Sequence, residues 1–198
     1  MKIELYIQNI ERWISDIAEG HAEIVLETAN NANALIKKRV IETGTKADGS
    51  KFEGYSTSPM LTNCSSMTQS ACSRKAGSKE KRKDLKWVTL KRGGKNVKLF
   101  ELEGGYKEYR ELHGRQTSFV DFAFSGRMWA DVQVTSNDND HRKGRATVSA
   151  MSDEQYKILE GNNAKREGIL DVSELEMNDL ASMIENRLVE MMQRNDIV

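Results

Sequence analysis

The stretch SELEMNDLASMIENRLVEMM, residues 173–192, carries the strongest fold signal in the sequence. Ser173 and Glu176 have the spacing of a capping box, in which each side chain binds the backbone N–H of the other at the start of a helix. Behind this start, apolar residues recur at three- and four-residue steps, which places them on one helix face. These residues are Met177, Leu180, Ile184, Leu188 and Met191. The stretch therefore predicts a capped, amphipathic C-terminal helix.

A longer helix is predicted at the other end of the chain. Its apolar residues also recur at helical spacing, and they are Ile10, Trp13, Ile14, Ile17, Ile24, Ala32, Leu35 and Ile36. The Gly20-His21 pair interrupts this stripe and favours a kink. The helix is expected to end near Gly44, with Lys37, Lys38 and Arg39 complementing its C-terminal dipole. Two amphipathic helices need a shared core, so the C-terminal face is expected to pack against Trp13, Ile14 and Ile17 or against a sheet.

Strand-like segments lie between the two helices. Residues 86–102 predict a β-hairpin, because two alternating segments flank Gly93-Gly94. Alternation also predicts strands at residues 119–124, 128–135 and 145–150, with a polar turn at 137–143. Short helices are predicted at residues 105–113 and behind Ser152, which has a second capping-box spacing with Gln155. The sequence predicts an α+β fold with a long helix near each end and short strands between them.

Residues 58–102 are predicted to form an arm or hairpin inserted into a single domain, 1–198. Six Ser and three Thr fall within residues 56–73, and large apolar residues are few there. Such a segment buries too little apolar surface to offset its ordering entropy of about 1–2 kcal/mol per residue. We therefore expect residues 58–83 to be mobile in a free subunit and to become ordered against a partner.

Charge is unevenly distributed in a chain whose net charge is zero. Residues 74–98 hold eleven Lys and Arg against Glu80 and Asp84, which gives this segment +9 and the remainder −9. The segment is either a solvated loop or a contact surface for an acidic protein or the DNA backbone. The candidate contacts are Arg74, Lys75, Lys79, Lys81, Arg82, Lys83, Lys86, Lys91 and Arg92.

No known catalytic motif is present in the sequence, so we expect neither an enzyme nor a cofactor. Cys64 and Cys72 lack the further ligands of a zinc site and are expected to be free thiols. Isolated histidines such as His21 and His113 fit helix positions better than catalytic roles. Asp138, Asp140 and His141 fit a polar turn better than a metal site. No stretch approaches the ~20 apolar residues of a membrane span, and no membrane partner is expected.

Methionines on the C-terminal helix have two interpretations. Met183 and Met192 lie off the main apolar stripe, whereas Met191 lies on it. Core packing is one explanation. A subunit interface is the other, because methionine side chains repack easily. We take Met183, Met191 and Met192 as candidate subunit-interface residues.

The order of these features resembles the virion-morphogenesis, tail-completion and head–tail joining (neck) proteins of tailed bacteriophages. Four local matches carry the resemblance: IKKRV at 36–40 followed by KADGSKF at 46–52; YST at 55–57; VDFAFSGRM at 120–128; and Tyr156, Gly161, Arg166 and GIL at 168–170 before the capped helix. The match covers most of the chain outside residues 58–102. The chain departs from the family in its large basic insertion and in lacking a proline near Arg166.

The resemblance implies a small antiparallel sheet flanked by a long N-terminal and a C-terminal helix, in a structural virion protein made in the host cytoplasm. It implies a closed ring, expected to have six copies, at the neck or tail end of the particle. The partners would be other copies of the chain, neck proteins on the portal side, tail or tail-tube proteins, and the DNA backbone in the channel. Closed rings arise from head-to-tail interfaces whose rotation closes. The competing hypothesis is a nucleic-acid-binding accessory protein that uses residues 74–98.

Overall fold

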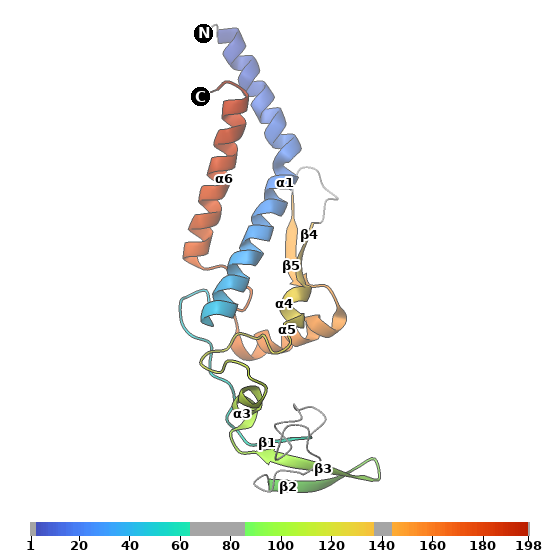
Figure 1. Cartoon of the computed structure of the whole chain (residues 1–198). Coiled ribbons are helices and arrows are strands. Elements are labelled where there is room, and N and C mark those ends of the chain that lie inside the picture. Colours follow the sequence, from blue (N-terminus) through green and yellow to red (C-terminus); the bar gives the residue numbers. More distant parts are fainter. Residues whose placement is uncertain (1–2, 64–85, 137–143, 198) are drawn as a thin grey trace. The chain divides into compact units, whose positions relative to one another are not determined.

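A computed structural model describes residues 3–63, 86–136 and 144–197 of the 198-residue chain. It has an α+β fold with a long helix near each end and small antiparallel sheets, as the sequence predicts (Figure 1). The elements, in chain order, are α1 (Ile3–Thr43), β1 (Met60–Thr62), β2 (Lys86–Arg92), β3 (Lys95–Leu102), α3 (Gly105–Leu112), α4 (Arg127–Asp131), β4 (Val132–Ser136), β5 (Ala146–Ala150), α5 (Asp153–Arg166) and α6 (Glu174–Arg194).

The chain divides into two compact units. The first unit joins Met1–Phe52 to Asp121–Val198, and the second unit, Glu53–Val120, is inserted between these two segments. The predicted arm, 58–102, lies inside the second unit, which also contains α3 and the segment that returns to the first unit. Most of the segment expected to be mobile, from residue 64 onward, lies outside the described residues. The part that is described contains β1, which the arm hypothesis did not include.

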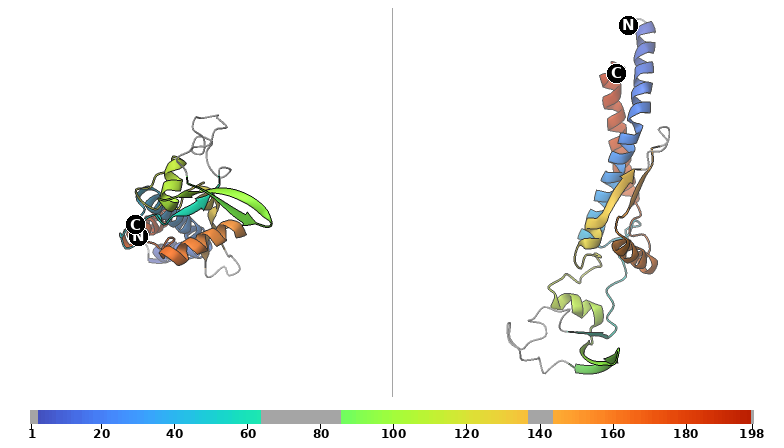
Figure 2. Two further views of the ribbon diagram at one scale, coloured as in Figure 1. Left: turned by 90° about the horizontal axis from the view of Figure 1, so that it is seen from below. Right: turned by 90° about the vertical axis from the view of Figure 1, so that its right-hand side faces the viewer.

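In the first unit, α1 packs against α6 and against the antiparallel pair β4–β5 (Figures 1 and 2). The core lies where the C-terminal half of α1 meets this pair: Ile36, Val40 and Val132 are almost completely buried. Lys37 reaches over the same place and donates from Nζ to the Val132 carbonyl at 2.6 Å. The two predicted long helices are therefore confirmed. α1 runs through Gly20-His21 as one helix, and the kink expected there stays a prediction.

Gly20 lies at the packing contact between α1 and α6. A Cβ placed on Gly20 would lie 3.7 Å from Cε of Met191, so the glycine faces α6 directly. Two expectations about this helix pair are wrong: Ile14 and Met177 were expected in the shared core, and both are more than half exposed. Leu180 is buried as expected, and Ile184 and Leu188 are partly buried. The pair meets along a face of α1 that contains polar residues, which an apolar stripe does not reveal.

The segment between the two units differs from the prediction. Residues 119–124 were expected to form a strand and are irregular, because Phe122 adopts a left-handed backbone conformation (φ 52°) that no strand accommodates. The Asp121 side chain accepts from the backbone N–H of Ala123, and the Asp121 carbonyl accepts from the Trp129 indole. These hydrogen bonds replace the strand ladder that the alternation predicted.

The strand predicted at residues 128–135 is wrong in its first half. Gly126, at φ 78°, starts the short helix α4, which buries Met128 and Trp129, and β4 begins only at Val132. The strand predicted at 145–150 is confirmed as β5. The predicted turn at 137–143 lies outside the described residues. The predicted helix behind Ser152 is confirmed as α5.

Asp131 and Ser152 join the end of α4 to the start of α5. The Ser152 hydroxyl accepts from the Gln155 N–H, as the predicted cap requires, but the Ser152 N–H donates to the Asp131 carboxylate at 2.8 Å. Met151 donates to the same carboxylate. These hydrogen bonds, chiefly the one from the Ser152 backbone, hold the pKa of Asp131 below its ordinary value. The Ser152 N–H, which a complete capping box would pair with the Gln155 side chain, is therefore bound by the Asp131 carboxylate instead.

The second unit contains the hairpin β2–β3, which is confirmed, with β1 added on the other side of β3 in the antiparallel order β1-β3-β2 (Figure 1). Gly93 and Gly94 both have positive φ, as a two-residue type I′ turn requires. The core of this unit is formed by Phe100 and Leu102, which are fully buried. The predicted helix at 105–113 is confirmed as α3.

Arg110 is the largest fully buried side chain of the second unit. Only 1% of its surface is exposed, and its guanidinium lies 4.3 Å from the centre of the Tyr55 ring. Its Nε donates to the Gln116 carbonyl at 3.1 Å. Tyr106 extends this cluster, because its ring makes edge contact with Tyr55 and stacks on Tyr109. The buried arginine therefore ties α3 to the segments on both sides of it.

Replacing Gly105 with alanine is expected to unfold or loosen the second unit. Gly105 has φ +63°, and a Cβ there would lie 2.2 Å from the Ser58 carbonyl oxygen and 2.8 Å from the Thr57 carbonyl carbon. The contacting atoms belong to the backbone, so relief requires the segment to move. We expect a loss above about 2 kcal/mol in chemical denaturation followed by Trp87 fluorescence. Gly54→Ala, at a position with open space around it, is the control, and equal stability of the two variants would contradict the contact.

None of the helices in the described part of the chain combines the length and the apolar character needed to cross a membrane.

Candidate functional site: the surfaces of the helix pair and the basic hairpin

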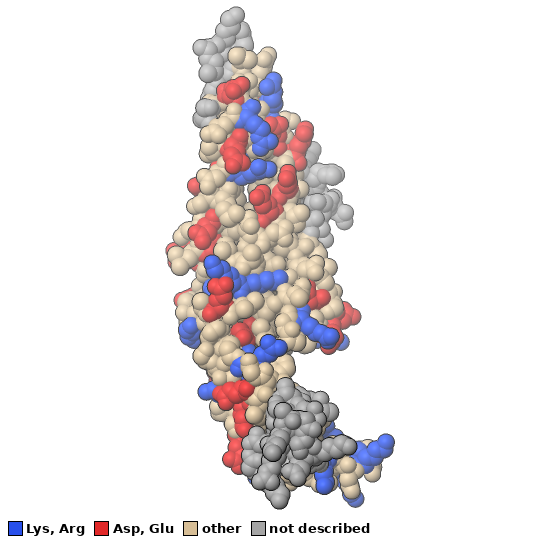
Figure 3. All heavy atoms as spheres, in the orientation of Figure 1, with Lys and Arg blue, Asp and Glu red and all other residues tan. Residues whose placement is uncertain are grey.

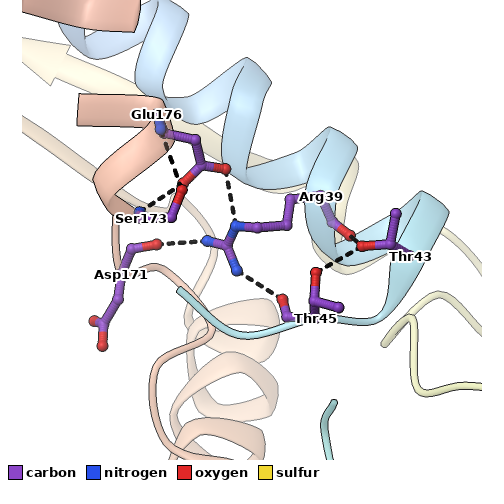
Figure 4. Close-up of polar contacts among 6 residues, drawn as sticks. All are labelled: Arg39, Thr43, Thr45, Asp171, Ser173 and Glu176. Atoms are coloured by element: carbon purple, nitrogen blue, oxygen red, sulfur yellow. Dashed lines mark hydrogen bonds and ion pairs between the residues drawn. The ribbon is translucent and has the colours of Figure 1, made fainter. Parts of the chain in front are cut away.

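An ion-pair cluster, here called the Arg39 clasp, closes one end of the helix pair (Figure 4). Arg39, near the end of α1, donates from Nε to the carboxylate of Glu176 on α6 at 2.8 Å. Its other nitrogens donate to the carbonyls of Thr45 and Asp171, each at 2.6 Å. The clasp therefore binds three segments together: the end of α1, the loop after it, and the entry to α6.

Glu176 is held from two sides. Its carboxylate accepts from Arg39 and, at 2.7 Å, from the backbone N–H of Ser173, while the Ser173 hydroxyl accepts from the Glu176 N–H. The predicted capping box is confirmed, and the ion pair is built onto it. The Arg39 and Glu176 side chains are only 12% and 9% exposed. A charge pair this buried is stable only while both partners are present.

Acid is expected to weaken the clasp. Burial alone would raise the pKa of the Glu176 carboxyl, but hydrogen bonds from Arg39 and Ser173 outweigh it and leave the pKa below the ordinary 4.5. A carboxyl with a lowered folded-state pKa contributes stability that is present above its unfolded pKa and lost as pH falls through the folded value. We expect Glu176→Gln to be less stable than the wild type at pH 7 and to lose less stability on acidification below 4.5. Glu174→Gln, at an exposed position, should follow the wild-type curve.

An open groove runs along the junction of α1 and α6. It has a volume of about 330 Å³, and its lining includes Ile24 from α1 and Met183 and Ile184 from α6. Arg187 also lines it and lies 3.9 Å from Glu23 of α1. Met183 is 43% exposed, so this predicted interface residue is accessible at the groove.

The other two predicted interface methionines are less accessible. Met191 is 8% exposed and contacts Gly20, so it belongs to the packing between α1 and α6. Met192 is partly buried. An intersubunit role therefore stays a prediction, with Met183 as the most accessible of the three.

Large apolar side chains gather on the surface of the helix pair. The described part of the chain exposes twelve of them, four on α1 and four on α6. Those on α1 are Leu5, Ile7, Ile14 and Ile41; those on α6 are Leu175, Met177, Met183 and Val189. Single exposed hydrophobic residues need no explanation, but two thirds of this set lie on two packed helices, which makes the pair the candidate surface for association.

The predicted basic surface is only partly described. Arg74, Lys75, Lys79, Lys81, Arg82 and Lys83 lie outside the described residues. Lys91, Arg92 and Lys95 are exposed at the end of the β2–β3 hairpin, and Lys98, which pairs with Thr89, is exposed midway along it. Lys86 is also exposed, but it forms an ion pair with Glu101, which raises the pKa of Lys86. The hairpin therefore presents three cations at its tip, a fourth midway along β3, and an ion-paired lysine at its base.

Among the residues that the structure describes, the candidate catalytic and metal-binding groups do not lie together in one site. His21 Nδ1 and His113 Nδ1 each contact a carbonyl of their own helix, at 2.8 and 2.7 Å. Cys64, Cys72, Asp138, Asp140 and His141 lie outside the described residues. Within the described ranges, no group of three or more His, Cys, Asp or Glu side chains is placed to hold a metal ion.

The sequence did not reveal the Arg39 clasp. Arg39 was one of three basic residues assigned to the C-terminal dipole of α1, and Glu176 was assigned to a capping box. Their shared role joins residues 137 positions apart, and no local pattern encodes such a distance. No protein-family model, curated protein or solved structure matches the chain. The functional argument therefore rests on the surfaces described above.

Proposed function

We propose that this chain is a structural virion protein that forms a ring at the head–tail neck or the tail end of a tailed bacteriophage. It is made in the host cytoplasm and works through shape and surface contacts. Its partners are other copies of the chain, neck proteins on the portal side and tail proteins. The observation that carries the proposal is the concentration of exposed apolar side chains on the α1–α6 pair.

Several features support an assembly role for this pair. Met183 and Ile184 line an open groove, and half-buried apolar positions beside exposed ones are typical of surfaces that are covered in a complex. The Arg39 clasp fixes the two helices at one end, so the surface is presented by a rigid pair. Acidic and basic side chains alternate over the same region (Figure 3), which suits a polar rim around apolar contacts.

The proposed position of the ring, at the neck or the tail end, comes from the resemblance to phage neck and tail-completion proteins. Its four local matches fall on α1 and the loop after it, on the segment leading to α4, and on α5 to α6. The long helix at each end and the small antiparallel sheet fit the fold that the resemblance implies.

The proposal is tested by removing the gene from the phage genome that encodes the chain. The expected result is a loss of infectious particles, with unjoined heads and tails or tails of uncontrolled length in electron micrographs. Supplying the protein from a plasmid should restore normal particles. Normal, infectious particles in the absence of the protein would overturn the proposal.

A second candidate function is nucleic-acid binding, favoured by one observation on the hairpin. Lys91, Arg92, Lys95 and Lys98 are all exposed, and the sequence from residue 87 to 100 contains no Asp or Glu. Cations on a protruding hairpin suit the phosphate backbone, without readout of base sequence.

The salt dependence of DNA binding separates the two functions. If the hairpin binds phosphates, Lys91→Ala/Arg92→Ala/Lys95→Ala should reduce the slope of log K against log salt by about 0.9 for each phosphate that is no longer neutralised. Lys38→Ala/Lys157→Ala/Lys165→Ala removes as many exposed charges from helices and should leave the slope unchanged. Weak binding with equal slopes for both variants would exclude the hairpin as the DNA-binding surface.

A further inference from the structure

The N-terminal half of α1 carries a coiled-coil repeat. Ile7, Ile14 and His21 are spaced seven residues apart, and so are Ile10, Ile17 and Ile24. The two series alternate at steps of three and four, which is a 3.5-residue repeat with isoleucine at five of six positions. A repeat of this period matches the seam between helices that coil around each other. Ile7, Ile10, Ile14 and Ile17 are here called the isoleucine stripe.

The partner helix within the chain does not cover this stripe. α6 and the residues after it meet α1 on a different face: Asn9 donates to the Asp196 carbonyl at 3.4 Å, and Asp16 accepts from Asn195 at 2.8 Å. Gly20 faces Met191 on the same side. At 3.6 residues per turn, Asp16 lies ~160° around the helix from Ile14. Near the N-terminus of α1, these contacts with α6 and the residues after it are made by polar positions and a glycine.

The exposures of the stripe residues agree with this placement. Ile7 is 49% exposed and Ile14 is 56% exposed, while Ile10 and Ile17 are partly buried. On the N-terminal side of Asn9, α1 continues past the end of α6 (Figures 1 and 2), so its first turns, which include Ile7, project from the pair. The isoleucine stripe thus begins on these turns and continues beside the end of α6, which meets α1 on another face.

We propose that α1 of a second copy of this chain docks on the isoleucine stripe. The repeat fits a helix with the same repeat, because each side chain then enters a space between four residues of the facing helix. The surface beside the stripe also suits an identical partner: Gln8, Glu11, Ser15 and Ala18 lie there and include a single charged residue. Two copies therefore bring little like-charge repulsion to the contact.

The composition of the stripe also bears on the number of copies. Isoleucine in both series of a heptad repeat shifts the preference from two helices toward three or more. A stable pairwise interface buries about 800 Å² per partner, far more than two half-exposed isoleucines supply. Two chains therefore associate only weakly through this contact, and the total buried area grows as more copies join. The inference deepens the proposed function, on which it rests for the place of assembly, by naming the surface through which copies meet.

Self-association of the purified full-length chain tests the stripe. Sedimentation velocity across a concentration series is expected to show wild-type species of three or more copies in growing proportion. Ile7→Glu/Ile14→Glu should weaken this association at least ~10-fold, because carboxylates would enter an apolar seam. Arg12→Glu changes the charge by the same two units on another side of α1 and should associate like the wild type. Both variants should keep the wild-type circular dichroism spectrum. A wild type that remains monomeric at every concentration, or equal association of the two variants, would overturn the inference.

Cross-linking supplies the second measurement. In a background with Cys64→Ser and Cys72→Ser, oxidation of Ile14→Cys should trap disulfide-linked dimers, whereas Arg12→Cys, on another side of α1, should not. Absence of cross-linking at both positions, or equal cross-linking at both, would contradict docking on the stripe. These outcomes can be told apart from a failure of the proposed function. If the chain associates through the stripe but particles form normally without it, only the proposed function is overturned. If particles require the chain but no cross-links form at the stripe, only this inference is overturned.

Discussion

Replacing Arg39 with alanine is expected to destabilise the first unit by about 3–5 kcal/mol, because it leaves the buried Glu176 carboxylate without its charge partner. The same change removes the hydrogen bonds to the Thr45 and Asp171 carbonyls. Chemical denaturation of the full-length chain measures the loss. A Trp87→Phe background restricts the tryptophan signal to Trp13 and Trp129, which lie in the first unit.

Two further variants identify the cause of the Arg39→Ala effect. Lys38→Ala removes a neighbouring exposed charge and should change stability by less than about 0.5 kcal/mol. The double variant Arg39→Met/Glu176→Leu removes both charges and should recover most of the loss, since apolar replacements of buried ion pairs are often neutral. If Arg39→Ala costs less than about 1 kcal/mol, the clasp does not hold the helix pair together.

Leu180→Ala is expected to cost about 2–5 kcal/mol in the same assay. Leu180 is 5% exposed on the face that α6 turns into the fold, and its truncation leaves a cavity. Met177 is the matched control, because it belongs to the same apolar stripe in the sequence but is 56% exposed. Met177→Ala should therefore change stability by less than about 0.5 kcal/mol. Equal losses for the two variants would show that the face of α6 is oriented differently.

Local patterns predicted most of the elements. The two long helices, the cap at Ser173, the hairpin around Gly93-Gly94 and the α+β class follow from periodicity, capping and turn chemistry, all of which act over a few residues. The prediction failed at residues 119–131, where Asp121 and Trp129 make hydrogen bonds that override the alternation. Burial of Trp129 is a tertiary effect, and alternation does not encode it.

The candidate surfaces were less predictable than the fold. A stripe of apolar residues on α1 was expected to face the core, yet Ile14 is exposed and α6 contacts Asn9, Asp16 and Gly20 instead. Periodicity shows that a helix has an apolar face but does not show what covers it. The exposed isoleucines are thus one place where the fold of one chain leaves apolar side chains uncovered.

The two ends of α1 differ in what they contact. Near its C-terminal end, α1 is fixed to α6 by Arg39 and to β4 by the hydrogen bond from Lys37 to the Val132 carbonyl. Near its N-terminal end, Ile7 and Ile14 remain exposed. In a ring, such a helix would be anchored in its own subunit at one end and would contact neighbouring subunits at the other.

Imaging purified particles of the phage that encodes the chain, with the chain carrying a small tag, decides whether it forms a ring in the virion. We expect tag density at a single level, at the head–tail junction or the tail end, with several copies arranged in a closed ring. Particles without the tagged chain, or with one isolated copy at that level, would contradict this expectation.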